Sequence, residues 1–88
     1  MTEREVEVIN TLGIHARPSS MIVKTALQFK SAISISKSGA EADAKSIMSV
    51  MMLAATCGSK VTIRASGDDE KQALDAVAGL FARKFDEE

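Results

Sequence analysis

The sequence contains few of the residues that bridge, stack or bind metals. It has no tryptophan, no tyrosine, three phenylalanines, one histidine and one cysteine among 88 residues. A single cysteine cannot form an internal disulfide, and one cysteine with one histidine supplies too few ligands for a structural zinc site. We therefore expect Cys57 to be inert and partly buried. The formal net charge of −1 and the few aromatic rings also argue against nucleic-acid binding, which needs a basic surface and stacking platforms.

Long apolar runs are missing as well. No stretch reaches the ~20 apolar residues that span a bilayer, and the charged residues 1–5 are not followed by an apolar segment of signal-peptide type. We therefore expect a cytoplasmic protein that does not insert into a membrane. A chain of 88 residues has room for one domain, residues 1–88, with a modest core and one functional site.

Alternation of polar and apolar residues predicts four strands. It covers residues 4–9, 32–36, 40–44 and 61–65, and Ser38-Gly39 supplies a hairpin turn between the second and third. In the first strand, the alternating positions that we expect to face the core are Val6 and Val8.

Apolar residues at helical spacing predict three helices between these strands. The first covers residues 16–29, and the second covers residues 46–56 with Gly58 as its C-terminal stop. The third opens at residues 67–70, a glycine followed by three acidic residues. The expected core positions of the three helices are Ile22, Val23, Ala26 and Leu27, then Val50, Leu53 and Ala54, then Leu74, Val77, Leu80, Phe81 and Phe85. We expect the acidic tail, residues 86–88, to be frayed and solvated.

The order β-α-β-β-α-β-α predicts an α+β fold. Such an order is typical of an open-faced sandwich, in which a four-stranded antiparallel sheet carries all three helices on one face.

The segment Gly13-Ile14-His15-Ala16-Arg17-Pro18 contains the only histidine and the only proline of the chain. An imidazole at a helix entrance can accept a phosphoryl group, because free N–H groups and the helix dipole stabilise the resulting anion. Arg17 adds a permanent cation that can bind phosphate oxygens in pairs. The plainer alternative is a solvated histidine at an ordinary helix start, and the preference of proline for the first helical position would make Arg17 the N-cap.

This segment, together with Lys-Ser-Ile-Met-Ser-Val-Met-Met-Leu at residues 45–53, resembles the HPr family. These are the phosphocarrier proteins of the bacterial phosphoenolpyruvate-dependent sugar phosphotransferase system, and the resemblance covers essentially the whole chain. It implies the same open-faced sandwich, with His15 near the cap of the first helix and its Nδ1 atom as the phosphoryl acceptor. It also implies that the backbone N–H groups of Ala16 and Arg17 contact the phosphate. Leu12 departs from the polar residue that many members carry at this position.

A carrier needs partners, because the residues around His15 include no carboxylate pair, metal-ligand set or nucleotide-binding loop. We therefore expect no cofactor, no metal and no enzymatic activity of the domain itself. The resemblance implies that enzyme I donates the phosphoryl group and that a sugar-specific enzyme IIA accepts it. We expect the chain to be a monomer.

The second helix contains four further apolar residues besides Val50, Leu53 and Ala54, which fill its core face. At helical spacing these four residues cannot all point to the core as well. An exposed surface rich in methionine is adaptable and suits docking to more than one partner. Core filling is an equally good interpretation for any single one of them. The predicted docking residues are Ile47, Met48, Met51 and Met52, with Met21 and Lys24 of the first helix extending the same surface.

Ser46 has two compatible interpretations. A serine just before an amphipathic helix is a favourable N-cap. The surrounding Lys-Ser-Ile-Met also resembles the regulatory site of HPr proteins that a dedicated ATP-dependent serine kinase phosphorylates.

The sequence thus predicts a histidine phosphocarrier of sugar transport. One alternative is a regulatory HPr paralogue in a nitrogen-type or kinase-controlled relay without sugar transport. A second is an interaction module that is never phosphorylated and in which the histidine is incidental.

Overall fold

The computed structural model describes residues 1–87 and contains one four-stranded antiparallel sheet. The strands lie in the order β1-β4-β2-β3, so that the first strand pairs with the last and the hairpin forms the other edge. Their bounds are Thr2–Glu7 for β1, Ala32–Lys37 for β2, Ala40–Asp43 for β3 and Lys60–Ser66 for β4.

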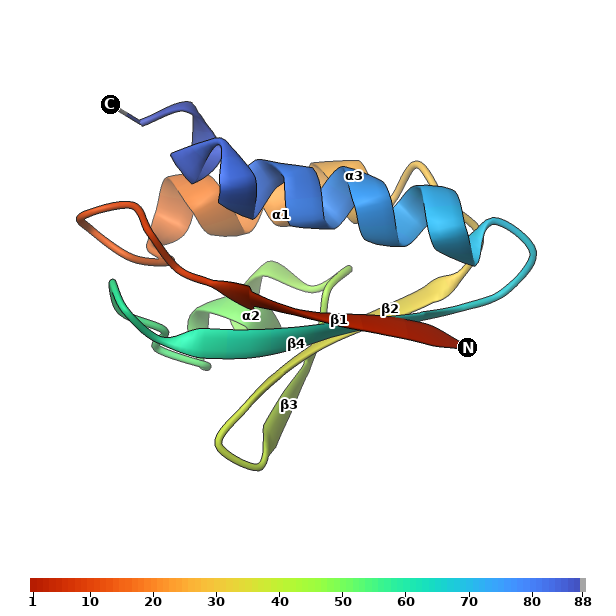
Figure 1. Ribbon diagram of the computed structural model, residues 1–88, viewed down its shortest axis with the longest axis horizontal. Helices are drawn as coiled ribbons and strands as arrows, with labels where there is room; N and C mark the ends of the chain where they lie inside the picture. Colours follow the sequence, from red (N-terminus) through yellow and green to blue (C-terminus); the bar gives the residue numbers. More distant parts are fainter. Residues whose placement is uncertain (88) are drawn as a thin grey trace.

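Three helices cover one face of this sheet, and Figure 1 shows α1 and α3 side by side above it. Helix α1 covers Ala16–Ala26, α2 covers Ile47–Met51 and α3 covers Glu70–Ala82, followed by a short turn of 3-10 type, η1, at Lys84–Asp86. The predicted α+β open-faced sandwich is confirmed.

The core lies between the sheet and the helices because alternate strand residues point to the same side. Ile35 of β2 is paired with Ile63 of β4, and both are fully buried beneath the helices. Each such aliphatic side chain contributes about 1.5–3 kcal/mol by burial. The expected core positions Val8, Ile22, Val77 and Phe81 are buried, and Val6 packs against the same cluster from a partly buried position.

Two helices are shorter than their sequence patterns predict. Helix α1 ends at Ala26, with Leu27 as its C-cap, and the Leu27 side chain is 62% exposed instead of buried. Helix α2 ends at Met51 instead of continuing towards Gly58. In addition, Ala54 adopts a left-handed conformation (φ 51°) and is exposed, whereas the next residue, Ala55, takes the buried position.

A tertiary contact explains the early end of α2. The Lys37 ammonium, which reaches across from β2, lies 3.4 Å from the carbonyl oxygens of both Leu53 and Ala54. A cation here satisfies carbonyl groups that a continuing helix would have bonded to its own N–H groups. Cys57, in the loop that follows, is exposed and not partly buried as predicted.

The chain reverses direction after α3. Lys84, Phe85 and Asp86 all have positive φ angles, of 55°, 54° and 59°. Non-glycine residues avoid this conformation, so burial must offset its cost. Phe85 supplies that burial, because its side chain is fully buried. Its ring centroid lies 4.8 Å from that of Phe81. The expected core position of Phe85 is confirmed, although the residue lies beyond α3 in this turn.

A close backbone approach fixes the loop that leads into α1. Gly13 has φ +70°, and a β-carbon at this position would lie 2.6 Å from the carbonyl oxygen of Ala55. The neighbouring Ile14 N–H donates to that same oxygen at 2.9 Å. Only glycine fits here, and the contact ties the start of α1 to the loop that follows α2.

We predict that Gly13→Ala destabilises the protein more than Gly39→Ala does. Both glycines have positive φ, which costs a β-carbon about 1–2 kcal/mol, but nothing lies within 4 Å of a β-carbon at Gly39. Urea unfolding of both variants measures the difference. Equal losses of unfolding free energy would show that the approach to Ala55 is unimportant.

Candidate functional site

His15 is the N-cap of α1, as the family resemblance implies, and Arg17 is already the second helical residue. The His15 backbone is extended (φ −100°, ψ −160°), and its carbonyl accepts the first helical hydrogen bond from Ser19 at 3.0 Å. Its imidazole makes no capping bond to the helix and remains 37% exposed. The ring is therefore accessible at the positive end of the helix.

The first turn of α1 has free donors beside this ring. Pro18 has no N–H group, and the hydrogen bonds found among residues 1–87 use neither the N–H of Ala16 nor that of Arg17. Free N–H groups at a helix N-terminus form a favourable anion site. Ala16 and Arg17 thus have the donors expected of phosphate-contacting residues.

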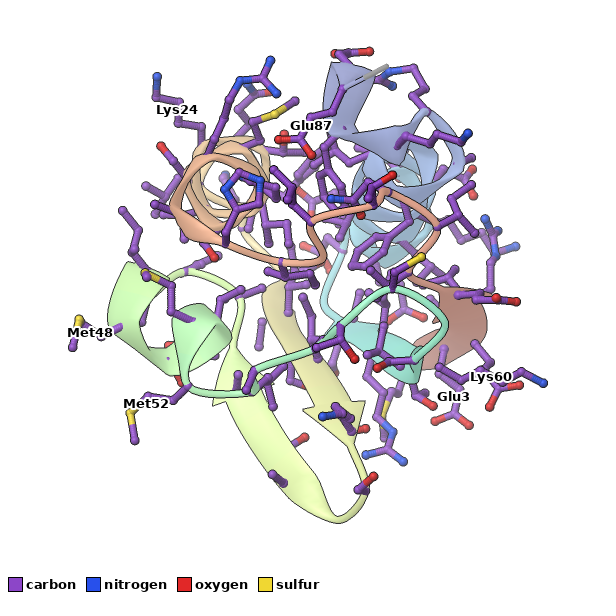
Figure 2. All side chains as sticks on the ribbon, turned by 90° about the vertical axis from the view of Figure 1, so that its left-hand side faces the viewer. Glu3, Lys24, Met48, Met52, Lys60 and Glu87 are labelled. Carbon is purple, nitrogen blue, oxygen red and sulfur yellow. The ribbon has the colours of Figure 1, made fainter. Side chains whose placement is uncertain are left out.

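Glu87 reaches this site from the other end of the chain. One carboxylate oxygen, Oε2, lies 2.8 Å from Nε2 of His15, and the other, Oε1, accepts a hydrogen bond of 3.0 Å from the Asn10 amide. The Glu87 side chain is only 16% exposed. Figure 2 shows its carboxylate beside the start of α1.

The expectation of a frayed, solvated tail is therefore wrong for Glu87. Asp86 is exposed as predicted but is paired with Arg83 at 3.3 Å, and Glu88 lies outside the described residues. The reason is the left-handed turn at Phe85, which directs the chain back over the start of α1.

The surroundings of Glu87 favour its ionised form. The hydrogen bond from Asn10 is the largest influence that lowers the pKa of the Glu87 carboxyl. Burial opposes this effect by raising the pKa, and the hydrogen bond and charge of His15 and the charge of Arg17 lower it further. The carboxyl group that faces the imidazole therefore stays ionised to a lower pH than an ordinary glutamate does.

Arg17 contacts the same C-terminal segment. Its Nη1 donates to the Phe85 carbonyl at 3.0 Å and lies 3.6 Å from Oε2 of Glu87. The side chain is 55% exposed, and a guanidinium has five N–H donors. Arg17 therefore keeps donors for a further anionic group beside His15.

Sequence reasoning did not identify Asn10 or Glu87 as site residues. Asn10 is buried, and besides contacting Glu87 its amide donates to the Gly13 carbonyl at 2.7 Å. The two residues are 77 positions apart in the sequence, and neither belongs to a local motif. The only available signals were an asparagine in the turn after β1 and an acidic residue near the end.

The predicted docking residues of α2 form an exposed apolar surface, which we call the methionine patch. It consists of Ile47, Met48, Met51 and Met52, with exposures of 42%, 69%, 40% and 79%. In Figure 2, Met48 and Met52 point away from the body of the protein, and Lys24 projects outward from α1. Met21 differs, because it is partly buried and packs against the core.

Ser46 is the N-cap of α2. Its hydroxyl oxygen accepts a hydrogen bond of 3.3 Å from the Ser49 N–H, so the predicted cap is confirmed. It lies immediately before the methionine patch.

Within residues 1–87, no group of three or more histidine, cysteine, aspartate or glutamate side chains could hold a metal ion. A search of the same residues for a helix long and apolar enough to cross a membrane finds none.

The fold and the site together define a class: small open-faced sandwiches in which a histidine caps the first helix and an arginine follows two residues later. The family described as "PTS HPr component phosphorylation site" matches residues 2–83. The chain belongs to the HPr family of phosphocarrier proteins.

Individual relatives are similar in sequence to this chain over almost its full length. The chain is 47% identical to a phosphocarrier protein HPr of Cupriavidus necator over 87 residues, covering 99% of this chain and 98% of that protein. A phosphocarrier protein NPr of Proteus mirabilis is 41% identical over 86 residues, with 97% and 96% covered.

Solved structures of HPr proteins have the same fold as this chain. The crystal structure of an HPr from Thermoanaerobacter tengcongensis, 42% identical, superposes with a TM-score of 0.96 over 100% of this chain and 99% of the other. A structure from the same organism described as an HPr dimer gives a TM-score of 0.79 at 41% identity, covering 99% and 100%. Dimers thus occur among the neighbours, and a monomeric state of this chain stays a prediction.

The lowered pKa of Glu87 predicts a pH-dependent contribution to stability. Because the folded pKa is lower than the unfolded one, the carboxylate stabilises the fold above the unfolded value, and this stabilisation is lost as pH falls through the folded pKa. Glu87→Gln should therefore be less stable than the wild type at neutral pH, with a difference that shrinks in acid. Urea unfolding of both proteins from neutral to acidic pH measures this difference in stability. A pH-independent difference would contradict the prediction.

Proposed function

We propose that this chain carries a phosphoryl group on His15 in the phosphoenolpyruvate-dependent sugar phosphotransferase system. Phosphorylated enzyme I donates the group to Nδ1 of His15, and a sugar-specific enzyme IIA removes it. The protein is a carrier with a transient phosphohistidine and is not an enzyme in its own right.

The observation that carries this proposal is the accessible imidazole at the start of α1, beside the free N–H groups of Ala16 and Arg17. These donors, the helix dipole and the Arg17 guanidinium can each stabilise the added negative charge. A half-exposed ring also suits a carrier, because both the donor and the acceptor must reach it in turn.

The methionine patch supports docking as the means of transfer. Three exposed apolar side chains on one short helix and a fourth at its C-cap are costly in water and adaptable against different partners. Lys24 is an exposed charge on α1, but it lies apart from Met48 and Met52 in Figure 2. Met21 is partly buried against the core, so only part of its side chain can contact a partner.

The main alternative is a regulatory paralogue in a nitrogen-type or kinase-controlled relay. Its supporting observation is the similarity to an NPr phosphocarrier at 41% identity. The two functions share acceptance from a phosphorylated donor and differ in the acceptor. Transfer from the phosphorylated chain to a sugar-specific enzyme IIA separates the two functions. A chain that accepts the phosphoryl group but fails to pass it to enzyme IIA favours the relay.

The first prediction of this proposal is that His15→Ala abolishes phosphoryl acceptance from enzyme I and phosphoenolpyruvate. The chain has no other histidine, so the wild-type label should be acid-labile and base-stable throughout. The fold should persist because a half-exposed N-cap side chain without a capping bond contributes little to stability. A folded His15→Ala protein that still takes label would disprove the role of His15 and favour an incidental histidine.

For the docking surface, Met48→Asp should weaken binding of enzyme I and alter thermal stability little, because Met48 is 69% exposed. The effect should appear as a raised KM for the carrier, by about tenfold or more. Gln72→Asp adds the same charge at an exposed position of α3 and is the matched control. Equal effects of the two substitutions would indicate a response to net charge and not to the patch.

Ser46 is proposed as a regulatory site for an HPr serine kinase. A phosphate here would add nearly two negative charges two residues from Met48. Enzyme I must bring its own phosphoryl group to the adjoining surface, so desolvation and like-charge repulsion would both oppose docking.

Ser46→Asp should therefore keep or slightly raise the melting temperature, since aspartate is also a good N-cap. It should slow phosphoryl transfer to His15, and less so at high salt, where exposed charges are screened. Melting temperature and loading rate are measured at two salt concentrations, with Ser38→Asp in the exposed β2–β3 turn as the control. Normal loading of Ser46→Asp at low salt would leave Ser46 as a helix cap only.

A further inference from the structure

We propose that Glu87 is a positioning residue for phosphoryl transfer, which holds the proton of the neutral imidazole on Nε2 and leaves Nδ1 of His15 as the nucleophile. The proposal rests on the function proposed above and adds a residue from the far end of the chain. Glu87 acts through His15 and needs no contact with the phosphoryl group.

Nε2 of His15 and Oε2 of Glu87 form a hydrogen bond of 2.8 Å. An ionised carboxylate can only accept, so the ring must donate through Nε2–H. A neutral imidazole has one N–H, and its other nitrogen then carries the free lone pair. Within residues 1–87, Nδ1 has no hydrogen-bond partner, so this lone pair is available for attack.

Asn10 fixes the orientation of the Glu87 carboxylate. The Asn10 amide donates to Oε1 of Glu87 at 3.0 Å and to the Gly13 carbonyl at 2.7 Å. Both neighbours of the amide nitrogen are acceptors, so a flipped Asn10 would bring its own oxygen against two others. The buried asparagine thus keeps its donors towards Glu87 and leaves Oε2 for His15.

Positive charge develops on the imidazole ring during transfer. The Nδ1 lone pair forms a bond to phosphorus while the bond from phosphorus to the donor breaks, and that electron pair leaves with the donor. The ring keeps its Nε2 proton, so no base is needed and the phosphorylated imidazole becomes cationic. The Glu87 carboxylate lies 2.8 Å from that proton-bearing nitrogen and compensates the new charge.

The Glu87 charge also repels the incoming phosphoryl group, and Arg17 reduces this cost. Its Nη1 lies 3.6 Å from Oε2 of Glu87, so the guanidinium screens the carboxylate. The charges around the transferred group therefore act together: those of Arg17, Glu87 and the imidazole.

The test is the tautomer of His15, read from the imidazole ¹⁵N chemical shifts at alkaline pH, where imidazoles are neutral. The wild type should carry its proton on Nε2. Glu87→Ala should give a mixture of tautomers. In Glu87→Gln, Asn10 retains the side-chain oxygen, the new amide group faces Nε2 as a donor, and the proton should move to Nδ1.

Loading by enzyme I should follow the tautomer. We expect Glu87→Gln to lower kcat by at least about tenfold and more than Glu87→Ala, with little change in KM, because the wrong tautomer blocks the nucleophile. Asp86→Asn removes the adjacent carboxylate, which is exposed and paired only with Arg83 among the described residues. This control should leave both the tautomer and kcat unchanged.

An unchanged tautomer in Glu87→Gln, or wild-type kcat in both Glu87 variants, would overturn the positioning role. A wild-type protein that takes no phosphoryl group would overturn the proposed function, and this proposal with it. The two failures are distinguishable, because the tautomer is measured without any partner.

Discussion

The site depends on the close backbone approach between Gly13 and Ala55. The Ala55 carbonyl accepts from Ile14 at 2.9 Å and leaves no room for a β-carbon at residue 13. Since Ile14 immediately precedes the N-cap of α1, this contact determines where the helix starts and where the His15 ring lies. Ala55 belongs to the loop that follows α2, so this contact also joins the start of α1 to the segment next to the methionine patch.

A second constraint is electrostatic and comes from the C-terminus. Three successive residues with positive φ carry the chain back over α1, and the buried ring of Phe85 offsets the conformational cost. The turn places the Phe85 carbonyl and the Glu87 carboxylate beside Arg17 and His15. The charged groups of the site thus come from both ends of the chain: His15 and Arg17 from the start of α1, and Glu87 from the C-terminal segment.

The brevity of α2 explains how an 88-residue chain can expose a large apolar surface and still fold. Only Val50 of the five helical residues is buried, and Leu53 and Ala55 complete the core from the following loop. Because the core is closed by the sheet and the two longer helices, the methionine patch is free to contact partners. The core and the proposed docking surface therefore use different side chains, which is why substitutions in the patch should affect docking more than unfolding.

The sequence by itself determined the four strands, the order of the helices, the N-cap at Ser46 and the exposure of some of the apolar residues of the second helix, and the family resemblance placed His15 near the first cap. These features follow from local periodicity and from the hexapeptide and its family resemblance, and they involve residues close together in the chain. Only the tertiary structure decided the early end of α2, beyond which Lys37 of β2 reaches the Leu53 and Ala54 carbonyls, and the exposure of Leu27 and Ala54. It alone also brought Asn10 and Glu87 to His15, because a contact across 77 residues depends on how the last turn packs and leaves no periodic signal in the sequence.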